Sequence, residues 1–347
     1  MKTRLKLAAA VFAAVISTLV SCEKTQDVSG TGICNLTVRM PGLSEYETKV
    51  TGQSEANEKH ISNCQVFVFR EDNGKVDASG YFGTMDAGGS CSVDLNCTVG
   101  KRHVWVLVNT AGDYTSQIED EQSLKALYTE LKDNSKNALF MVGSDLNANL
   151  NEGACTVNIG VKRLAATVVL QNLTIDMESK AYQKPGVFKL QKIYLLNVCG
   201  RTCISEPDNV SGTIAEGYWY ARLAEETDSS KKGLIADDLA SPVSIDNGAS
   251  HSTAYTFYAY PNKCPHSVTT PFSPRATLLV VEAELDGEKY YYPLSFDKLE
   301  SNHRYAVSIT IKRPGSKNPY EPVLYSTAST SITVDDWAEG DTRNETI

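Results

Sequence analysis

The 347-residue sequence predicts an all-β fold, and two observations support this prediction. Short runs of alternating or β-branched residues recur along the chain, and strong turn signals such as Asp72-Asn73-Gly74 and Asp286-Gly287 separate them. Many short strands with such punctuation are typical of β-sandwiches and barrels. The length indicates about two domains, and 41% hydrophobic with 22% charged residues is typical of globular chains.

The expected elements follow one another along most of the chain. The strands are Ile33–Met40, Cys64–Phe69, Ser92–Cys97, Lys101–Asn109, Ala154–Val161, Ala166–Ile175, Lys189–Cys199, Thr253–Tyr260, Ala276–Leu285, Lys289–Phe296, Tyr305–Lys312 and Ser329–Trp337. One amphipathic helix is expected over Ser123–Asp133, because its leucines recur at helical spacing. A domain boundary is expected near Gly160–Arg163, and residues 205–250 are expected to form a long surface excursion.

The first twenty-two residues have the layout of an export signal. Lys2, Arg4 and Lys6 precede an apolar stretch from Leu7 to Val20, which ends at Ser21-Cys22. This layout resembles a bacterial lipoprotein signal, which implies that residues 1–21 are removed and that Cys22 carries the lipid anchor. Residues 22–32 are then a flexible tether. The alternative is an ordinary secretory signal with an incidental cysteine.

Composition argues against several classes of function. The net charge is −9 and the pI is about 5.2, whereas nucleic-acid binders are usually basic. The five histidines are scattered without metal-ligand spacing, and the chain has no nucleophile-elbow or phosphate-loop motif. We therefore expect no enzyme activity, no metal and no cofactor other than the covalent lipid.

The cysteines favour no zinc or redox motif, because no C-x-x-C occurs. An exported chain is able to pair its cysteines, and Cys199 and Cys203 would face each other across a tight turn at Gly200. Cys91 and Cys97 would lie too far apart on one strand to bond. Buried free thiols are the alternative for most of these residues.

Several segments, in order, carry a resemblance to a known family. They are the first strand ICNLTVRM, HISNCQVFVFREDNG, KRHVWVLVNT before SLKALYTELKD, VNIGVKRLAATVVL, FKLQKIYLLNV, and the C-terminal set KYYYPLSF, ESNHRYAVSITIKRPGSKNP and STSITVDDW. Together they make the chain similar to the Bacteroidales fimbrillin family, the type V pilins. The likeness extends from the lipobox to the last residues.

The resemblance implies two transthyretin-like β-sandwich domains, at residues 33–160 and 161–347, with one short helix in the first. It also implies a non-enzymatic subunit of a surface fimbria that supports adhesion. In the family, a lipidated precursor reaches the outer membrane and an arginine-specific protease cuts the loop after the first strand. That strand leaves, and the C-terminal strand of another subunit fills its groove. The implied partners are further copies, accessory fimbrial subunits, the processing protease and the outer membrane, with no nucleic acid.

Strand periodicity identifies the side chains that such an exchange would use. Cys34, Leu36, Val38 and Met40 share the apolar face of the first strand and are expected to fill the groove. The last strand would donate Ile332, Val334 and Trp337 as replacement apolar contacts. The alternative for this last strand is an ordinary edge strand of its own domain.

The loop after the first strand departs from the family pattern. Lys49 stands where the family places the cleaved arginine, and the nearest arginine, Arg39, lies inside the expected strand. A protease of different specificity would then cut at Lys49-Val50, or the chain stays uncut and serves as an anchor or tip subunit.

A lipid-anchored glycan-binding protein is the alternative from another class. Exposed aromatic side chains at Tyr218, Trp219 and Tyr220 would support it. A second cluster, at Tyr290, Tyr291 and Tyr292, would either stack on sugars or pack across strands.

Overall fold

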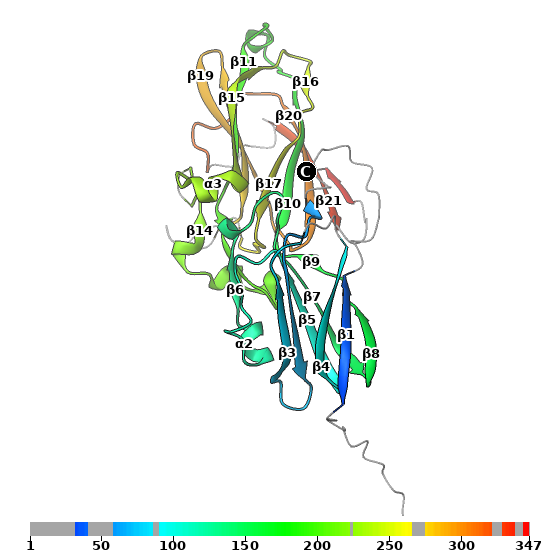
Figure 1. Cartoon of the computed structure of the whole chain (residues 1–347). Helices are drawn as coiled ribbons and strands as arrows, with labels where there is room; N and C mark the ends of the chain where they lie inside the picture. The colour runs from blue at the N-terminus through cyan, green and yellow to red at the C-terminus, as the bar shows by residue number, and fades with distance from the viewer. Residues whose placement is uncertain are drawn as a thin grey trace, which may run out of the picture.

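The computed structural model describes residues 32–40, 58–85, 90–222, 225–265, 275–320, 328–336 and 343–346. These residues form an elongated molecule built mainly of β-strands, with the first strands at one end (Figure 1). The all-β prediction is therefore confirmed. The expected signal at 1–21 and nearly all of the tether at 22–32 lie outside the described residues.

Two sheets form the N-terminal half. One has three strands in the order β4-β1-β8, and the other has five in the order β3-β2-β5-β7-β9. The strands are β1 Ile33–Met40, β2 Cys64–Arg70, β3 Val76–Phe82, β4 Cys91–Thr98, β5 Gly100–Val108, β7 Met141–Leu150, β8 Gly153–Asn158 and β9 Lys162–Arg163.

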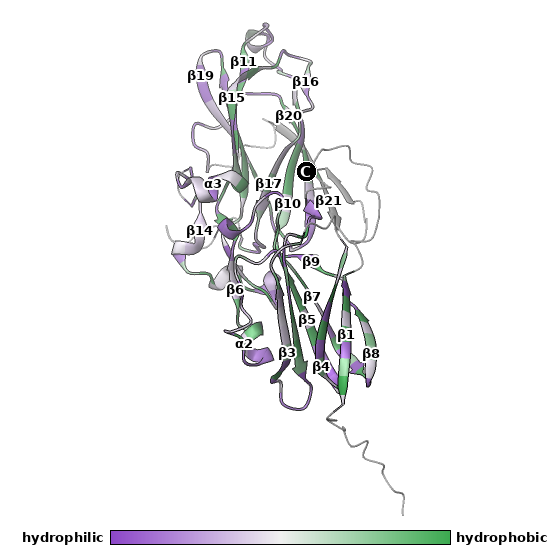
Figure 2. Ribbon diagram, in the orientation of Figure 1, coloured by the Kyte–Doolittle hydropathy of each residue, from purple (hydrophilic) through white to green (hydrophobic). Residues whose placement is uncertain are grey.

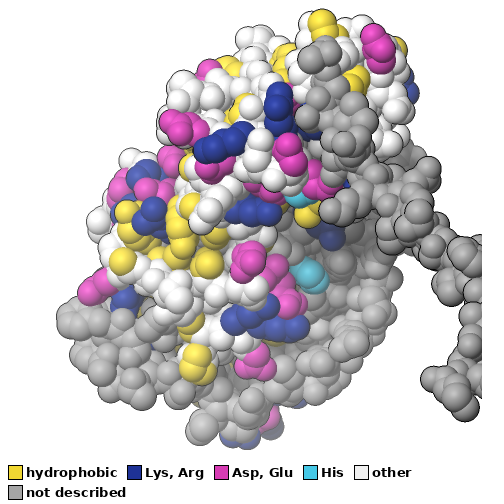
Figure 3. All heavy atoms as spheres, turned by 90° about the horizontal axis from the view of Figure 1, so that it is seen from below, with side chains coloured by type: hydrophobic (Ala, Val, Ile, Leu, Met, Phe, Trp, Pro, Cys, Tyr) yellow, Lys and Arg dark blue, Asp and Glu magenta, His cyan; other side chains and the backbone are white. Residues whose placement is uncertain are grey.

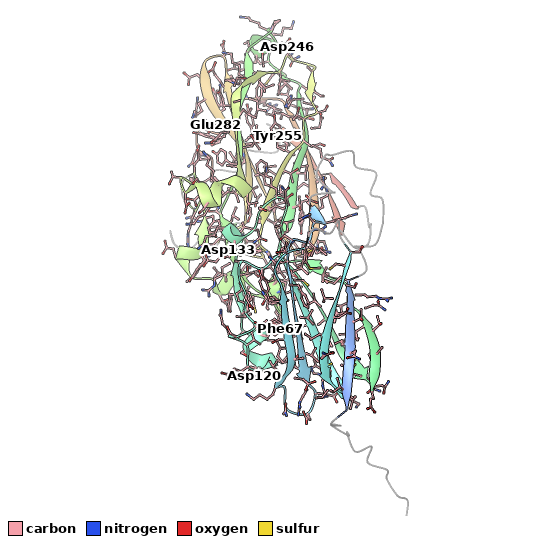
Figure 4. The ribbon with its side chains drawn as sticks, in the orientation of Figure 1. Phe67, Asp120, Asp133, Asp246, Tyr255 and Glu282 are labelled. Carbon is pink, nitrogen blue, oxygen red and sulfur yellow. The ribbon has the colours of Figure 1, made fainter. Side chains whose placement is uncertain are left out.

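Strand β2 of the five-stranded sheet is buried on both faces. On β2, Val66 and Val68 belong to the core shared with β1, which we call the groove core. Their neighbours Phe67 and Phe69 belong to the larger core that extends through the C-terminal half. Because successive side chains on a strand point to opposite faces, this alternation places β2 between two cores. Phe67, which is labelled in Figure 4, is accordingly buried.

The C-terminal half contains two further sheets. A six-stranded sheet has the order β16-β10-β20-β21-β22, with β17 also paired to β10, and a four-stranded sheet has the order β15-β11-β18-β19. The strands are β10 Ala166–Ile175, β11 Phe188–Leu196, β15 Ala236–Ser244, β16 Ser250–His251, β17 Tyr255–Ala259, β18 Leu278–Leu285, β19 Glu288–Ser295, β20 His303–Ile311, β21 Ala328–Asp336 and β22 Arg343–Thr346.

Shorter elements complete the described residues. β6 Tyr128–Glu130 pairs with β13 Arg201–Cys203, and β12 Val198–Cys199 pairs with β14 Trp219–Tyr220. The α-helices are α2 Glu121–Lys125 and α3 Ser229–Ile235. Single 3-10 turns lie at Leu131–Asp133, Lys180–Tyr182, Pro207–Asn209, Ser211–Thr213 and Glu216–Tyr218.

Polar contacts also join the two halves. Tyr258 of β17 donates a hydrogen bond across the two halves to Glu58 at 2.7 Å, and within the N-terminal half the guanidinium of Arg163 on β9 donates to the Glu58 carbonyl at 3.0 Å. All three residues are buried. Hydrogen bonds between buried groups, together with the shared larger core, fix the halves against each other.

The prediction of a helix over Ser123–Asp133 is wrong beyond Lys125. Asp120 caps the helix by accepting a hydrogen bond from the Ser123 amide at 2.9 Å, and the helix ends after Lys125. The following residues, Tyr128–Glu130, instead form β6 and pair with β13. Pairing with a distant strand has overridden a local helical pattern.

The sequence also missed strands. β3 and β7 were not expected, and the stretch 205–250 holds β14, α3 and β15 rather than only a surface excursion. β7 carries few buried apolar residues, so its pattern is weak.

Cys199 and Cys203, which the sequence places across a tight turn, are free thiols in the structure. Cys199 donates to the Arg201 carbonyl and Cys203 to the Lys125 carbonyl.

Candidate functional site: the groove of the first strand

β1 is the central strand of its sheet and the only link between its two neighbours within the described residues. It pairs antiparallel with β4 from Ile33 opposite Thr98 to Met40 opposite Cys91. On its other side it pairs parallel with β8. Because β4 and β8 do not pair with each other, removal of β1 would leave two separate strand edges facing an open groove.

The two faces of β1 differ sharply in exposure. Cys34, Leu36, Val38 and Met40 are 0–1% exposed and lie in the groove core. The opposite face is mostly exposed, and Ile33 is 62% exposed. Figure 2 shows this alternation as hydrophobic and hydrophilic bands along β1. The structure thus places all four side chains that the sequence assigned to the apolar face inside the groove.

Further backbone hydrogen bonds hold β1 near both of its ends. The Val99 amide donates to the Gly32 carbonyl at 3.1 Å, and the Ile159 amide donates to the Arg39 carbonyl at 2.8 Å. Near the middle of the strand, Thr37 donates to the Asp94 carboxylate at 2.6 Å. Every one of these bonds would have to break if β1 left, and the groups on β4 and β8 would lose their partners.

The strands β4 and β8, which flank β1, are the two walls of the groove, and a buried ion pair braces β4. Asp77 of β3 accepts from the Thr98 amide at 2.8 Å and hydroxyl at 2.7 Å, and from the Arg102 guanidinium at 3.1 Å. The Asp77 and Arg102 side chains are 1% and 3% exposed. Burial alone would raise the pKa of Asp77, but the Thr98 hydrogen bonds and Arg102 outweigh it and lower that pKa. No local sequence pattern predicts this brace, which joins the end of β4 to the five-stranded sheet.

The C-terminal strands lie at the edge of the six-stranded sheet. β21 pairs antiparallel with β20, with Ile332 opposite Val307, and β22 pairs with β21. β22 is the last strand in that order, so one of its edges has no strand neighbour among the described residues. Ile332 packs against the larger core. Val334 is placed by its backbone, opposite Tyr305, and Trp337 lies outside the described residues.

The other candidate residues do not gather into a site. Cys22, Lys49, Val50 and His266 lie outside the described residues. Within the residues that the structure describes, no group of three or more His, Cys, Asp or Glu side chains is arranged to hold a metal ion. His103 contacts Glu121 at 2.8 Å, and His303 contacts the Ser301 carbonyl at 2.8 Å. In that same part of the chain, no helix has the length and apolar character to cross a membrane.

The aromatic cluster considered for glycan stacking is mostly buried, which corrects that expectation. Trp219 and Tyr220 are 6% and 1% exposed and belong to the larger core. Tyr218 stacks on the Arg201 guanidinium at 4.2 Å. In the second cluster, Tyr292 is buried, and Tyr290 lies beneath the Lys317 ammonium at 3.7 Å. To stack on these rings, a sugar would therefore have to displace core residues or the Arg201 and Lys317 side chains that already cover them.

The surface charge is mixed. On the face drawn in Figure 3, Lys and Arg side chains lie among Asp and Glu side chains rather than in a field of one sign. Nucleic-acid interfaces usually present a clustered basic patch. This face offers none within the described residues.

Comparisons with known proteins agree with this architecture. Residues 34–167 match the family model described as major fimbrial subunit protein (FimA). A putative cell adhesion protein from Bacteroides eggerthii is 19% identical, with a TM-score of 0.65 over 90% of this chain and 98% of its own. A fimbrilin (fimA) from Porphyromonas gingivalis is 17% identical, with a TM-score of 0.61 over 89% and 98%.

A third solved structure, the tip fimbrial protein Mfa3 from Porphyromonas gingivalis, is 12% identical, with a TM-score of 0.52 over 88% of this chain and all of its own. At these identities the structural likeness shows a shared fold. The matches confirm the resemblance that the sequence predicted: this chain is similar to the fimbrillin family, by family model over residues 34–167 and by fold over most of its length.

Proposed function

We propose that this protein is a structural subunit of a cell-surface fimbria and that it polymerises by strand exchange. The observation that carries the proposal is the position of β1, which alone bridges β4 and β8 and fills the groove core with one face. The match of residues 34–167 to the major fimbrial subunit family supports the same function. In this proposal the chain acts by assembly and has no catalytic role.

The free energy of the groove explains why a vacated subunit would bind a new strand. Four side chains of β1 are fully buried, and burying them contributes on the order of 6–12 kcal/mol before ordering costs. Without β1, the backbone groups along β4 and β8 lose their partners in an apolar groove. An exposed edge of this kind favours the addition of another strand.

We propose that the replacement strand is the C-terminal segment of another copy, with Ile332, Val334 and Trp337 as its apolar contacts. β21 and β22 lie at a sheet edge, where detachment disrupts fewer neighbours than the loss of a central strand. Ile332 is only half-buried in its present place, so a deeper groove would bury more of it.

The remaining steps complete the proposal. Residues 1–21 direct export, Cys22 carries a lipid that anchors the precursor to the outer membrane, and cleavage at Lys49-Val50 frees β1. The chain divides into domains at 33–160 and 161–347, each a transthyretin-like sandwich. In support of this division, the groove core consists only of residues 34–161, and β10 begins the C-terminal sheets.

The first test is the N-terminus and intact mass of the protein taken from the native cell surface. A chain beginning at Val50 without lipid, together with SDS-resistant ladders in unboiled samples, is the expected result. If every chain recovered from the cell surface begins at acylated Cys22, release of β1 is refuted. The protein would then be an anchor, a tip subunit or a glycan-binding lipoprotein.

A mixing experiment tests the exchange itself. One variant carries a site-specific protease sequence after Lys49 and lacks residues 328–347, so it accepts a strand but donates none. The other variant keeps its C-terminus and has an uncleavable loop, so it donates but does not accept. After cleavage, the mixture should stop at SDS-resistant dimers, whereas a chain with both features forms ladders. Ladders formed by the acceptor variant alone would rule out the C-terminal segment as donor.

A further inference from the structure

Three thiols meet at β1. Cys34 of β1 lies directly opposite Cys97 of β4, and the Cys97 thiol points at the Cys34 carbonyl at 3.9 Å. On the other side, Cys155 of β8 is near enough to Cys34 to help raise its pKa. Cys34 and Cys97 are buried, and Cys155 is half-buried. The strand that would leave the groove therefore carries a thiol that lies near thiols on both groove walls.

The backbone geometry suits a covalent bond. Residues directly opposite each other on antiparallel strands have Cα atoms about 4.5–5.5 Å apart. Disulfides join residues whose Cα atoms are about 4.4–6.8 Å apart. Cys34 and Cys97 occupy such opposite positions. Cys155 pairs in register with Leu36, so it lies diagonal to Cys34, two residues along β1 on the same face of the sheet.

We propose that Cys34 forms a disulfide with one of these two wall thiols, and that this bond locks β1 in the groove after the loop has been cut. The inference rests on the proposed function in one respect: the lock matters because β1 has to leave for a fimbria to grow. Cleavage would then be necessary but not sufficient: a dithiol reductant, which is itself oxidised to a disulfide, would have to return both cysteines to thiols before β1 is released.

The oxidant is a disulfide donor, either a small-molecule or a protein disulfide of the compartment outside the inner membrane. One thiolate of the pair attacks the donor, forms a mixed disulfide and releases one donor thiol. The second thiolate of the pair then displaces the other donor sulfur, which leaves as the second thiol. The two protons lost by the cysteines end on the two donor thiols, so the cysteines are oxidised and the donor is reduced.

Burial governs when this reaction takes place. Burial and the neighbouring thiols raise the pKa of Cys34 to about 12, and burial raises the pKa of Cys97 to about 11. Both thiols are therefore protonated at neutral pH, and protonated thiols exchange slowly. The bond would form while β1 docks during folding. Once formed, it would be reduced more slowly than an exposed disulfide, because Cys34 is 0% exposed.

A second thiol pair provides an internal control. Cys64 of β2 and Cys91 of β4 also lie near enough to shift each other's pKa. A disulfide between them would join the two sheets of the N-terminal half without involving β1. It would leave the release of β1 unaffected.

The test uses the exported full chain with a site-specific protease sequence inserted after Lys49. The protein is oxidised with glutathione disulfide, cleaved, denatured and examined by intact mass with and without reductant. In the expected result, the fragment that contains β1 stays attached to the remainder without reductant and separates completely with it. The C34S variant should lose the attachment, and C64S should keep it. Because Cys22 lies on the same fragment, an attachment that persists in C34S belongs to Cys22 and overturns the proposal.

The wall partner follows from two further variants. If C97S alone or C155S alone abolishes the attachment, the substituted cysteine is the partner of Cys34. If only the double variant abolishes it, either wall cysteine is able to bond to Cys34. Attachment that survives the double C97S/C155S variant would overturn the proposal, as would complete separation of the oxidised wild-type fragments without reductant.

Polymerisation separates this inference from the proposed function. If both are correct, cleaved and oxidised wild-type protein forms ladders only with reductant, whereas C34S forms them without it. If the attachment forms but neither protein makes ladders under reduction, the lock stands and strand exchange fails. If oxidised wild type forms ladders without reductant as fast as C34S does, strand exchange stands and the lock is refuted.

Discussion

The brace between Asp77 and Arg102 should control the stability of the groove wall. Asp77→Asn keeps the shape of the side chain but removes its charge, so the buried Arg102 guanidinium loses its counter-charge. Removing one partner of a buried ion pair typically costs about 3–5 kcal/mol. For domains of this size, each kcal/mol shifts Tm by about 2–4 °C, which predicts a fall of roughly 6–20 °C for Asp77→Asn. Scanning calorimetry measures this fall directly.

The matched control is Glu71→Gln. Glu71 pairs with Lys101 at 3.7 Å, and both side chains are well exposed at 38% and 57%. Exposed pairs contribute about 0–1 kcal/mol, so this variant should unfold within a few degrees of wild type. Hydrogen exchange adds a local readout: Asp77→Asn should speed exchange in β4 and β1 more than in β18. Equal melting temperatures for the two variants would refute the role of the brace.

The lowered pKa of Asp77 also predicts how the stability of the protein depends on pH. The pKa of Asp77 in the folded protein lies below its unfolded value of about 3.9. Its contribution to stability is therefore complete above that value and is lost as pH falls through the folded-state pKa. The gap in Tm between wild type and Asp77→Asn should be constant near neutral pH and should narrow below about pH 4. A gap that widens with acid would contradict this assignment.

Three further substitutions test the packing, each measured by thermal unfolding. Leu36→Ala empties a fully buried position on β1 and should cost about 2–5 kcal/mol. Gly143→Ala would place a Cβ 2.3 Å from the Gly160 carbonyl oxygen, so β7 has to shift, at a cost of about 1–3 kcal/mol. Tyr258→Phe removes the buried hydrogen bond to Glu58 between the two halves and should cost about 1–3 kcal/mol.

Each of these substitutions has a control on the surface. Asn35→Ala lies on the exposed face of β1, a Cβ at Gly112 meets nothing within 4 Å, and Tyr81 is 39% exposed. Asn35→Ala, Gly112→Ala and Tyr81→Phe should each stay within about 0.5 kcal/mol of wild type. The packing argument fails at any position where the buried variant unfolds at the same temperature as its control.

The sequence by itself determined the class of fold and the faces of its clearest strands. The alternation in β1 places Cys34, Leu36, Val38 and Met40 together because the side-chain period of a strand is two, whatever its partners are. Asp286-Gly287 joins β18 and β19, and both residues have positive φ, as this type of tight hairpin requires. Such features depend on residues that are close in sequence.

Only the tertiary structure decided which strands are neighbours. No local pattern places β8 parallel to β1, because that pairing joins segments more than a hundred residues apart. For the same reason Tyr128–Glu130 became a strand despite its helical spacing: its partner, β13, is distant in sequence. The brace at Asp77 and the thiols around Cys34 arise in the same way, since each joins side chains that meet only after the sheets have packed.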